Sequence, residues 1–144
     1  MKYKIIDDKI LISLEKNDEI LTSLYELTKN KNINSGWVDG IGACKDVEIG
    51  FYNLKSKDYL KKQFKEDYEI TSLSGNFSYL EHNRSPWWHI HMNFSNKDFN
   101  VFGGHLFRAT ITASCEIIFH ISKYTINRKL DSNIGLCLWD LNND

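Results

Sequence analysis

Hydrophobic and polar positions alternate along several stretches of this chain, and alternation of that kind predicts β-strands. Ile10, Ile12 and Leu14 occupy every second position of residues 9–14, so this stretch has one apolar face. Alternation or a short apolar run predicts further strands over residues 37–39, 46–53, 68–79, 87–94, 101–107, 109–121 and 135–141. The chain therefore reads as rich in short strands.

One stretch has helical spacing instead. Ile20, Leu21, Leu24 and Leu27 would form a single apolar stripe, which predicts a helix over residues 18–30. Asn17 or Asp18 is the expected N-cap, because a short side-chain oxygen accepts a hydrogen bond from a free backbone N–H there.

These elements predict an α+β fold. We expect a mainly antiparallel sheet of about seven short strands packed with one principal α-helix. The 144 residues suit one domain over 1–144, with no linker or repeat. Hydrophobic residues make up 42% and charged residues 26% of the chain, as in soluble globular proteins.

Charge and cysteine content bear on the expected partners and cellular location of the protein. The net charge is -1, whereas proteins that grip nucleic-acid phosphates usually carry a basic excess. Lys61, Lys62 and Lys65 form a small basic run that reads as a solvated face. The chain has 3 cysteines with no CxxC, which indicates free thiols, and it starts without a signal-peptide pattern. We expect a cytoplasmic protein with no membrane partner.

Gly40 and Gly42 follow the short predicted strand at 37–39. Two glycines at this spacing suit either a close approach of two backbones or a phosphate-binding loop. The second reading is the weaker one, because the longer glycine pattern is missing.

The candidate chemistry lies in three histidines. His89 and His91 stand two positions apart in a predicted strand, so their side chains point the same way. If the chain turns near residues 97–98, opposing positions sum to about 194–196 by counting residues about that turn, which places His105 opposite one of them. Three imidazoles suit zinc with an open fourth position, and also iron, nickel or copper. Gly103 and Gly104 leave room for the third ligand and allow a bulge there.

The alternative is that these are ordinary half-buried histidines. His120 is expected to be a surface or interface residue, and His82 is expected to be a solvated loop residue. Glu116 is a weak candidate for a catalytic acid or base, with an exposed strand position as its plainer reading.

In order and spacing, the motifs from about residue 9 to 141 resemble the plant and prokaryote conserved (PPC) domain, in the form of a stand-alone bacterial-type member. The resemblance is carried by the helix and by these segments: Gly40–Ala43, Asp46–Tyr52, Glu69–Asn76, His89–His91 and Gly103–Leu106. It implies a homotrimer, and a metal bound by His89, His91 and His105. It also implies a DNA-associated role, and a fold like that of zinc-dependent acetolactate decarboxylases.

Some positions depart from the PPC pattern. The Arg-Gly-Arg-Pro hook of the plant proteins is missing, and Asn17 stands where relatives have Gly, although Asn tolerates left-handed geometry. Trp87 and Trp88 are unusually bulky and are expected to line a pocket or a trimer contact. Three functions stay open at this point: a DNA-associated or regulatory binding module, a metal-dependent lyase or hydrolase acting on a small molecule, and a metal that only braces a trimer.

Overall fold

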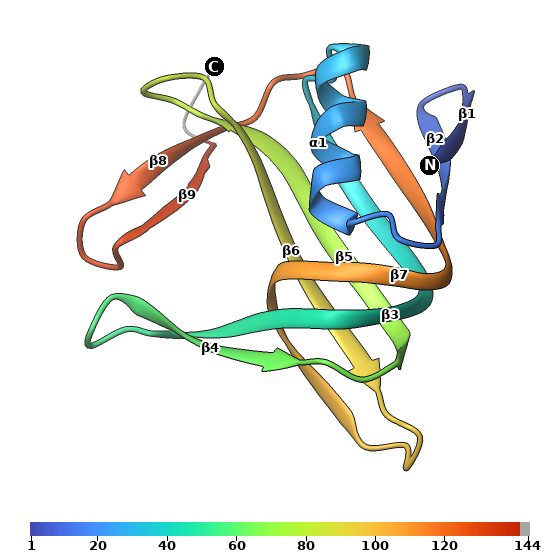
Figure 1. Ribbon diagram of the computed structural model, residues 1–144. Coiled ribbons are helices and arrows are strands. Elements are labelled where there is room, and N and C mark those ends of the chain that lie inside the picture. The colour runs from blue at the N-terminus through green and yellow to red at the C-terminus, as the bar shows by residue number, and fades with distance from the viewer. Residues whose placement is uncertain (142–144) are drawn as a thin grey trace.

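The computed structural model describes residues 1–141, so the last three residues of the expected domain lie outside it (Figure 1). One helix, α1 (Ile20–Lys31), accompanies nine strands within these residues. The strands are β1 (Lys2–Ile6), β2 (Lys9–Glu15), β3 (Ser35–Asn53), β4 (Asp58–Phe64), β5 (Tyr68–Leu80), β6 (Pro86–Ser95), β7 (Val101–Ser122), β8 (Asn127–Asp131) and β9 (Leu136–Asp140). The α+β class is confirmed.

The strands form one mixed sheet in the order β1-β2-β7-β3-β5-β8-β9. Strand β4 pairs with β3, and β6 pairs with both β5 and β7, so β3, β5, β6 and β7 close a circuit of pairings. Among the strands of residues 1–141, only β5 and β8 run parallel, over two residue pairs. All other pairings are antiparallel, as expected.

The expected number of about seven strands was wrong, for two reasons. Strands β1, β4 and β8 were not anticipated, because their residues alternate poorly, and most residues of β1 and β4 stay exposed. The stretches 37–39 and 46–53 belong to one strand, β3, and 101–107 and 109–121 belong to β7. Register shifts of the β3–β7 pairing interrupt the alternation there without ending the pairing.

Those shifts also bend the sheet. They lie between Gly42 and Cys44, between Lys45 and Glu48, and between Glu48 and Ile49. Figure 1 shows β3 and β7 turning sharply, so that their two halves run in different directions. The first half of β7 thereby pairs with β6, while the second half pairs with β2.

Helix α1 covers one face of the sheet (Figure 1). Ile20, Leu24 and Leu27 are buried there and Leu21 packs partly against the core, which confirms the apolar stripe. The buried face continues through Phe77, Phe94 and Phe119. Within the described residues no helix is long and apolar enough to cross a membrane.

The predicted N-cap of the helix was wrong. Glu19, and neither Asn17 nor Asp18, is the N-cap, and its carboxylate accepts hydrogen bonds from the N–H groups of residues 21 and 22. Asp18 is engaged elsewhere, since its carboxylate accepts from the Glu15 N–H at 2.8 Å and pairs with the N-terminal ammonium. Asn17 has φ 74°, so the left-handed geometry expected of it is confirmed.

The phosphate-loop reading of Gly40 and Gly42 was wrong, because both lie inside β3 with no loop around them. A Cβ on Gly40 would come within 2.8 Å of the Glu116 carbonyl oxygen, and one on Gly42 would collide with the Ser114 carbonyl. These glycines therefore allow β3 and β7 to lie close together.

Candidate metal centre

The β6–β7 hairpin carries all three candidate ligands. The chain turns at Asn96, whose N–H bonds to the Asn100 carbonyl, and His91 then faces His105 across the two strands. The expected register is therefore confirmed. No register shift interrupts this pairing, so the bulge that Gly103 and Gly104 would allow does not occur in it.

The three imidazoles converge on one point. The Nε2 atoms of His89 and His91 are 3.3 Å apart. Ring centroids are separated by 5.1, 5.3 and 5.6 Å, and one ring nitrogen from each histidine lies within 4.8 Å of the others. His91 is exposed, while His89 and His105 are half-buried, so the cluster opens to solvent on the His91 side.

Aromatic rings enclose His105. Tyr59 of β4 and Phe107 of β7 lie at centroid distances of 4.9 and 5.0 Å from its ring. Burial raises the pKa of Tyr59, so its hydroxyl stays protonated. Lys61 sits with its Nζ 3.8 Å from the Phe107 ring centre, which brings a cation near this wall.

Burial keeps two of the imidazoles neutral. It lowers the pKa of His89 to about 4, with help from the charge of Arg128 and from His91. It lowers the pKa of His105 to about 4 as well, with smaller contributions from the neighbouring histidines and cations. Neutral imidazoles have a free lone pair, which is the form that binds a metal.

Sequence reasoning missed the groups behind His89. Arg128 of β8 places its Nη2 atom 3.5 Å from His89 Nδ1, and that nitrogen also donates to Asn76 Oδ1 at 2.7 Å. Trp139 of β9 donates to the same oxygen at 3.2 Å. No sequence signal pointed to Arg128, because the segment around it contains no motif.

These residues fit a divalent transition metal. Two Nε2 atoms 3.3 Å apart cannot both carry protons directed at each other, and a cation between them would satisfy both lone pairs. The donor set is all nitrogen, with no carboxylate in the cluster, which suits zinc and its neighbours better than magnesium or calcium. His105 Nδ1 is buried with no hydrogen-bond partner within residues 1–141, and a buried polar atom left without a partner is costly.

The other candidates lie apart from this cluster. Glu116 is exposed on β7 opposite Ser13 of β2 and Ile41 of β3, and the structure does not bring it to the histidines. His120 is exposed opposite Lys9, and His82 is exposed in the turn between β5 and β6. Trp88 packs against Phe77 and Phe119 in the core, while Trp87 is half-exposed.

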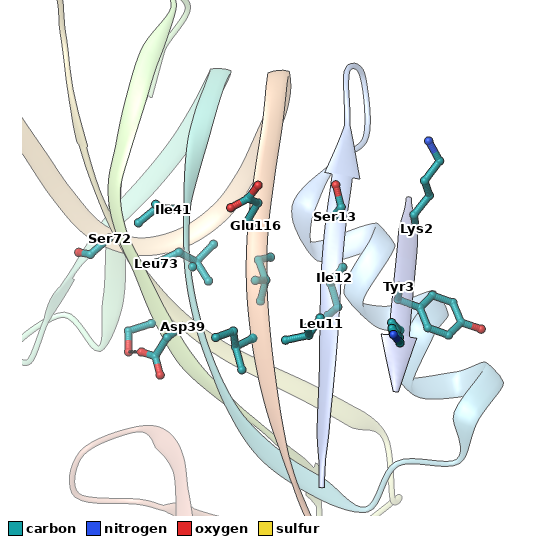
Figure 2. Close-up of a pocket in the computed structure, with 15 residues that line it drawn as sticks. Lys2, Tyr3, Leu11, Ile12, Ser13, Asp39, Ile41, Ser72, Leu73 and Glu116 are labelled. Atoms are coloured by element: carbon teal, nitrogen blue, oxygen red, sulfur yellow. Dashed lines mark hydrogen bonds between the residues drawn. The ribbon is translucent and has the colours of Figure 1, made fainter. Parts of the chain in front are cut away.

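A cavity of about 1040 Å³ lies on the side of the sheet opposite α1. Figure 2 shows Leu11, Ile41, Asp39 and Glu116 around it, coming from β2, β3 and β7. Ser74 also lines it and is the cross-strand partner of His91, so this face continues into the histidine cluster.

The fold and the histidine hairpin define a small domain with a three-histidine cluster, and the comparisons give its family. The family model of the Plants and Prokaryotes Conserved (PCC) domain, abbreviated PPC above, matches residues 1–122. The chain belongs to this family. A search of curated proteins found no match.

Several solved structures share the whole fold. A candidate DNA-binding protein from Bacteroides thetaiotaomicron is 32% identical with a TM-score of 0.93, covering 99% of this chain and 98% of its own. A metal-containing protein from Archaeoglobus fulgidus is 33% identical with a TM-score of 0.83, covering 96% of each chain. A PPC protein from Pyrococcus horikoshii is 28% identical with a TM-score of 0.84, covering 96% of this chain and 94% of its own.

The expected likeness to acetolactate decarboxylases holds for the fold. The Bacillus subtilis enzyme matches with a TM-score of 0.54 at 16% identity, covering 92% of this chain and 60% of that one. At this identity the match shows a shared fold and nothing about activity.

Proposed function

We propose that this chain is a stand-alone PPC-domain protein whose function depends on a divalent transition metal, zinc first, held by His89, His91 and His105. The observation that carries the proposal is the convergence of three ring nitrogens within 4.8 Å. The metal-containing relative from Archaeoglobus fulgidus supports it. Three neutral ligands leave a fourth position open on the metal.

The test is the metal content of purified protein. Wild type should retain about one metal ion per chain, and His89→Ala or His105→Ala should lose nearly all of it, because two nitrogens hold zinc far more weakly than three. His120→Ala is the matched control, since that histidine is exposed and lies outside the cluster. Equal metal in wild type and His89→Ala would reject the site.

We assign the assembled protein a DNA-associated or regulatory role in the cytoplasm, acting as a homotrimer. Two similar structures are named as candidate DNA-binding proteins. The overall net charge of -1 does not favour DNA binding, but residues 55–65 contain five lysines and one aspartate, a local excess of 5 − 1 = 4 positive charges. One of these lysines, Lys61, is paired with Glu48 of β3. This segment covers the β3–β4 turn, β4 and the residue after it, and phosphates bind to such basic surfaces.

Fluorescence anisotropy with labelled duplex DNA tests this role. We expect binding at an ionic strength of about 0.15 M that weakens as salt rises, because counterions are released. Lys62→Gln combined with Lys65→Gln should weaken binding, whereas Lys29→Gln combined with Lys31→Gln on α1 should not. Absence of salt-sensitive binding by wild type would reject the role.

A second function, a metal-dependent lyase or hydrolase acting on a small molecule, is favoured by one observation: the exposed His91 leaves the cluster open to solvent, and Tyr59 and Phe107 present ring surface beside His105. A bound metal would supply a Lewis acid or a water of lowered pKa. The chain would contribute orientation and an apolar wall. Turnover of a small-molecule library by wild type, lost in His91→Ala and retained in His120→Ala, would establish it.

A further inference from the structure

Asn76 of β5 lies directly across from His89, because the two residues are cross-strand partners in the β5–β6 pairing. Side chains of such partners lie on the same face of the sheet, with their Cβ atoms about 5 Å apart. Asn76 is 7% exposed, and its Oδ1 atom accepts hydrogen bonds from Arg128 Nη2 at 2.7 Å and from Trp139 Nε1 at 3.2 Å. Two donors therefore share the one side-chain oxygen that this partner of His89 offers.

Arg128 Nη2 also contacts the ring of His89, at 3.5 Å from Nδ1. A guanidinium has only donors, so this contact is a hydrogen bond when Nδ1 has a free lone pair. In a neutral ring the proton is then on Nε2, the atom that lies 3.3 Å from His91 Nε2. The contacts of metal-free His89 thus place its proton on the side that faces the cluster.

A metal at the cluster requires the opposite arrangement of this ring. The metal takes the lone pair of Nε2, so the ring proton must be on Nδ1, and a metal-bound histidine almost always donates that second N–H to an acceptor. Arg128 cannot accept it. The Asn76 oxygen can, and it lies close by, since Arg128 Nη2 contacts both this oxygen and His89 Nδ1.

We infer that Asn76 is a positioning residue of the three-histidine site: when a metal binds, its Oδ1 atom accepts the Nδ1–H of His89, in competition with the two donors that it has now. This inference rests on the proposed metal site. The exchange leaves the number of protons on the ring unchanged. Arg128 has two further hydrogen-bond partners and Trp139 is 39% exposed, so either donor can release the oxygen at the loss of one bond.

Cobalt titrations of metal-free protein, followed by the visible absorption of bound Co²⁺, test the role of Asn76. Asn76→Ala should weaken Co²⁺ binding by about 10- to 100-fold, because the acceptor for a metal-bound histidine is gone. Asn76→Asp should retain the affinity, since a carboxylate has lone pairs for this N–H and for Arg128. Ser78→Ala is the matched control: it removes a bond to Arg128 that is also 2.7 Å long, and it should leave the affinity unchanged. Equal losses in Asn76→Ala and Ser78→Ala would overturn the inference.

Removal of a competing donor should act in the opposite direction. Trp139→Phe keeps an aromatic ring but removes one donor to Asn76 Oδ1, and Arg128→Met removes the other. Each should tighten Co²⁺ binding by about three- to tenfold, which is what one hydrogen bond contributes. A purely structural role of these bonds predicts weaker binding, so unchanged or weaker binding in the two variants would reject the competition. If Arg128→Met fails to fold, Trp139→Phe decides, since that residue is partly exposed.

NMR of protein labelled with ¹⁵N-histidine locates the ring proton directly. In metal-free wild type the proton of His89 should be on Nε2, and in zinc-loaded protein it should be on Nδ1. A zinc-bound ring without a proton on Nδ1 would overturn the inference and leave the metal site standing, because Asn76 would have no N–H to accept. Equal cobalt binding by wild type and His89→Ala would instead reject the metal site itself.

Discussion

Gly75 sets how closely β6, the strand with two of the histidines, lies against β5. It pairs with Ile90, the residue between His89 and His91. A Cβ at this position would collide with the His89 carbonyl and lie 2.7 Å from Ile90 Cα, both of them backbone atoms. Since backbone in a central strand moves only with its neighbours, the cost of a larger residue falls on the site.

We therefore expect Gly75→Ala to lower the free energy of unfolding by about 1–3 kcal/mol through overpacking, and to weaken metal binding. Gly103→Ala is the matched control, because its Cβ would meet the exposed Asn93 side chain, which can rotate away. Urea denaturation and cobalt titration of both variants check this. Equal losses in the two would show that strand spacing is not the cause.

Among the elements, no helix of the described residues covers the face of the sheet opposite α1. Leu11, Ile41 and Ile118 are 40%, 60% and 42% exposed on adjoining strands, and Leu11 and Ile41 flank the cavity in Figure 2. Apolar surface gathered over one sheet face is typical of subunit interfaces. This face supports the homotrimer that we propose.

Ile41→Lys combined with Ile118→Lys should convert the proposed trimer to monomer, because six lysines would be buried across three copies of the face. Leu54→Lys is the control, being 67% exposed in the β3–β4 turn away from that face. Light scattering with size exclusion gives the masses. A wild-type monomer, or a trimer unaffected by the double substitution, would count against this arrangement.

At the scale of the whole molecule, stability should depend on pH through two histidines. The pKa of His89 and of His105 is about 4 in the fold, against 6.5 for an ordinary histidine. Below pH 6.5 the unfolded chain takes up protons that the folded chain does not, so stability falls as pH drops from 6.5 toward 4. Above about pH 7 these two groups have no effect.

Metal-free protein should therefore show a lower urea midpoint at pH 5.5 than at pH 7.5, and His89→Gln combined with His105→Gln should flatten this dependence. His120→Gln, an exposed position, should keep the wild-type slope. If the urea midpoint of the double variant changed with pH as much as that of wild type, other titratable groups would be responsible for the pH dependence.

Local pattern accounted for much of the fold. Alternation located β2 and β6, because each has one face in the core, and the stripe from Ile20 to Leu27 located α1. It also located β5, although residues 75–78 of that strand are buried on both faces. It failed within β5, where a register shift between Ile70 and Ser72 turns both Ile70 and Leu73 inward. It failed for β1 and β4 because edge strands bury too little to need alternation.

The sequence by itself determined that His89, His91 and His105 share one side of a hairpin, because strand period and hairpin register are local properties. Only the tertiary structure decided which side chains contact these histidines from other parts of the chain. Arg128 reaches His89 from 39 residues away, through a parallel pairing of β8 with β5. No periodicity of the sequence predicts such a contact, because it depends on where the β8–β9 hairpin pairs with the rest of the sheet.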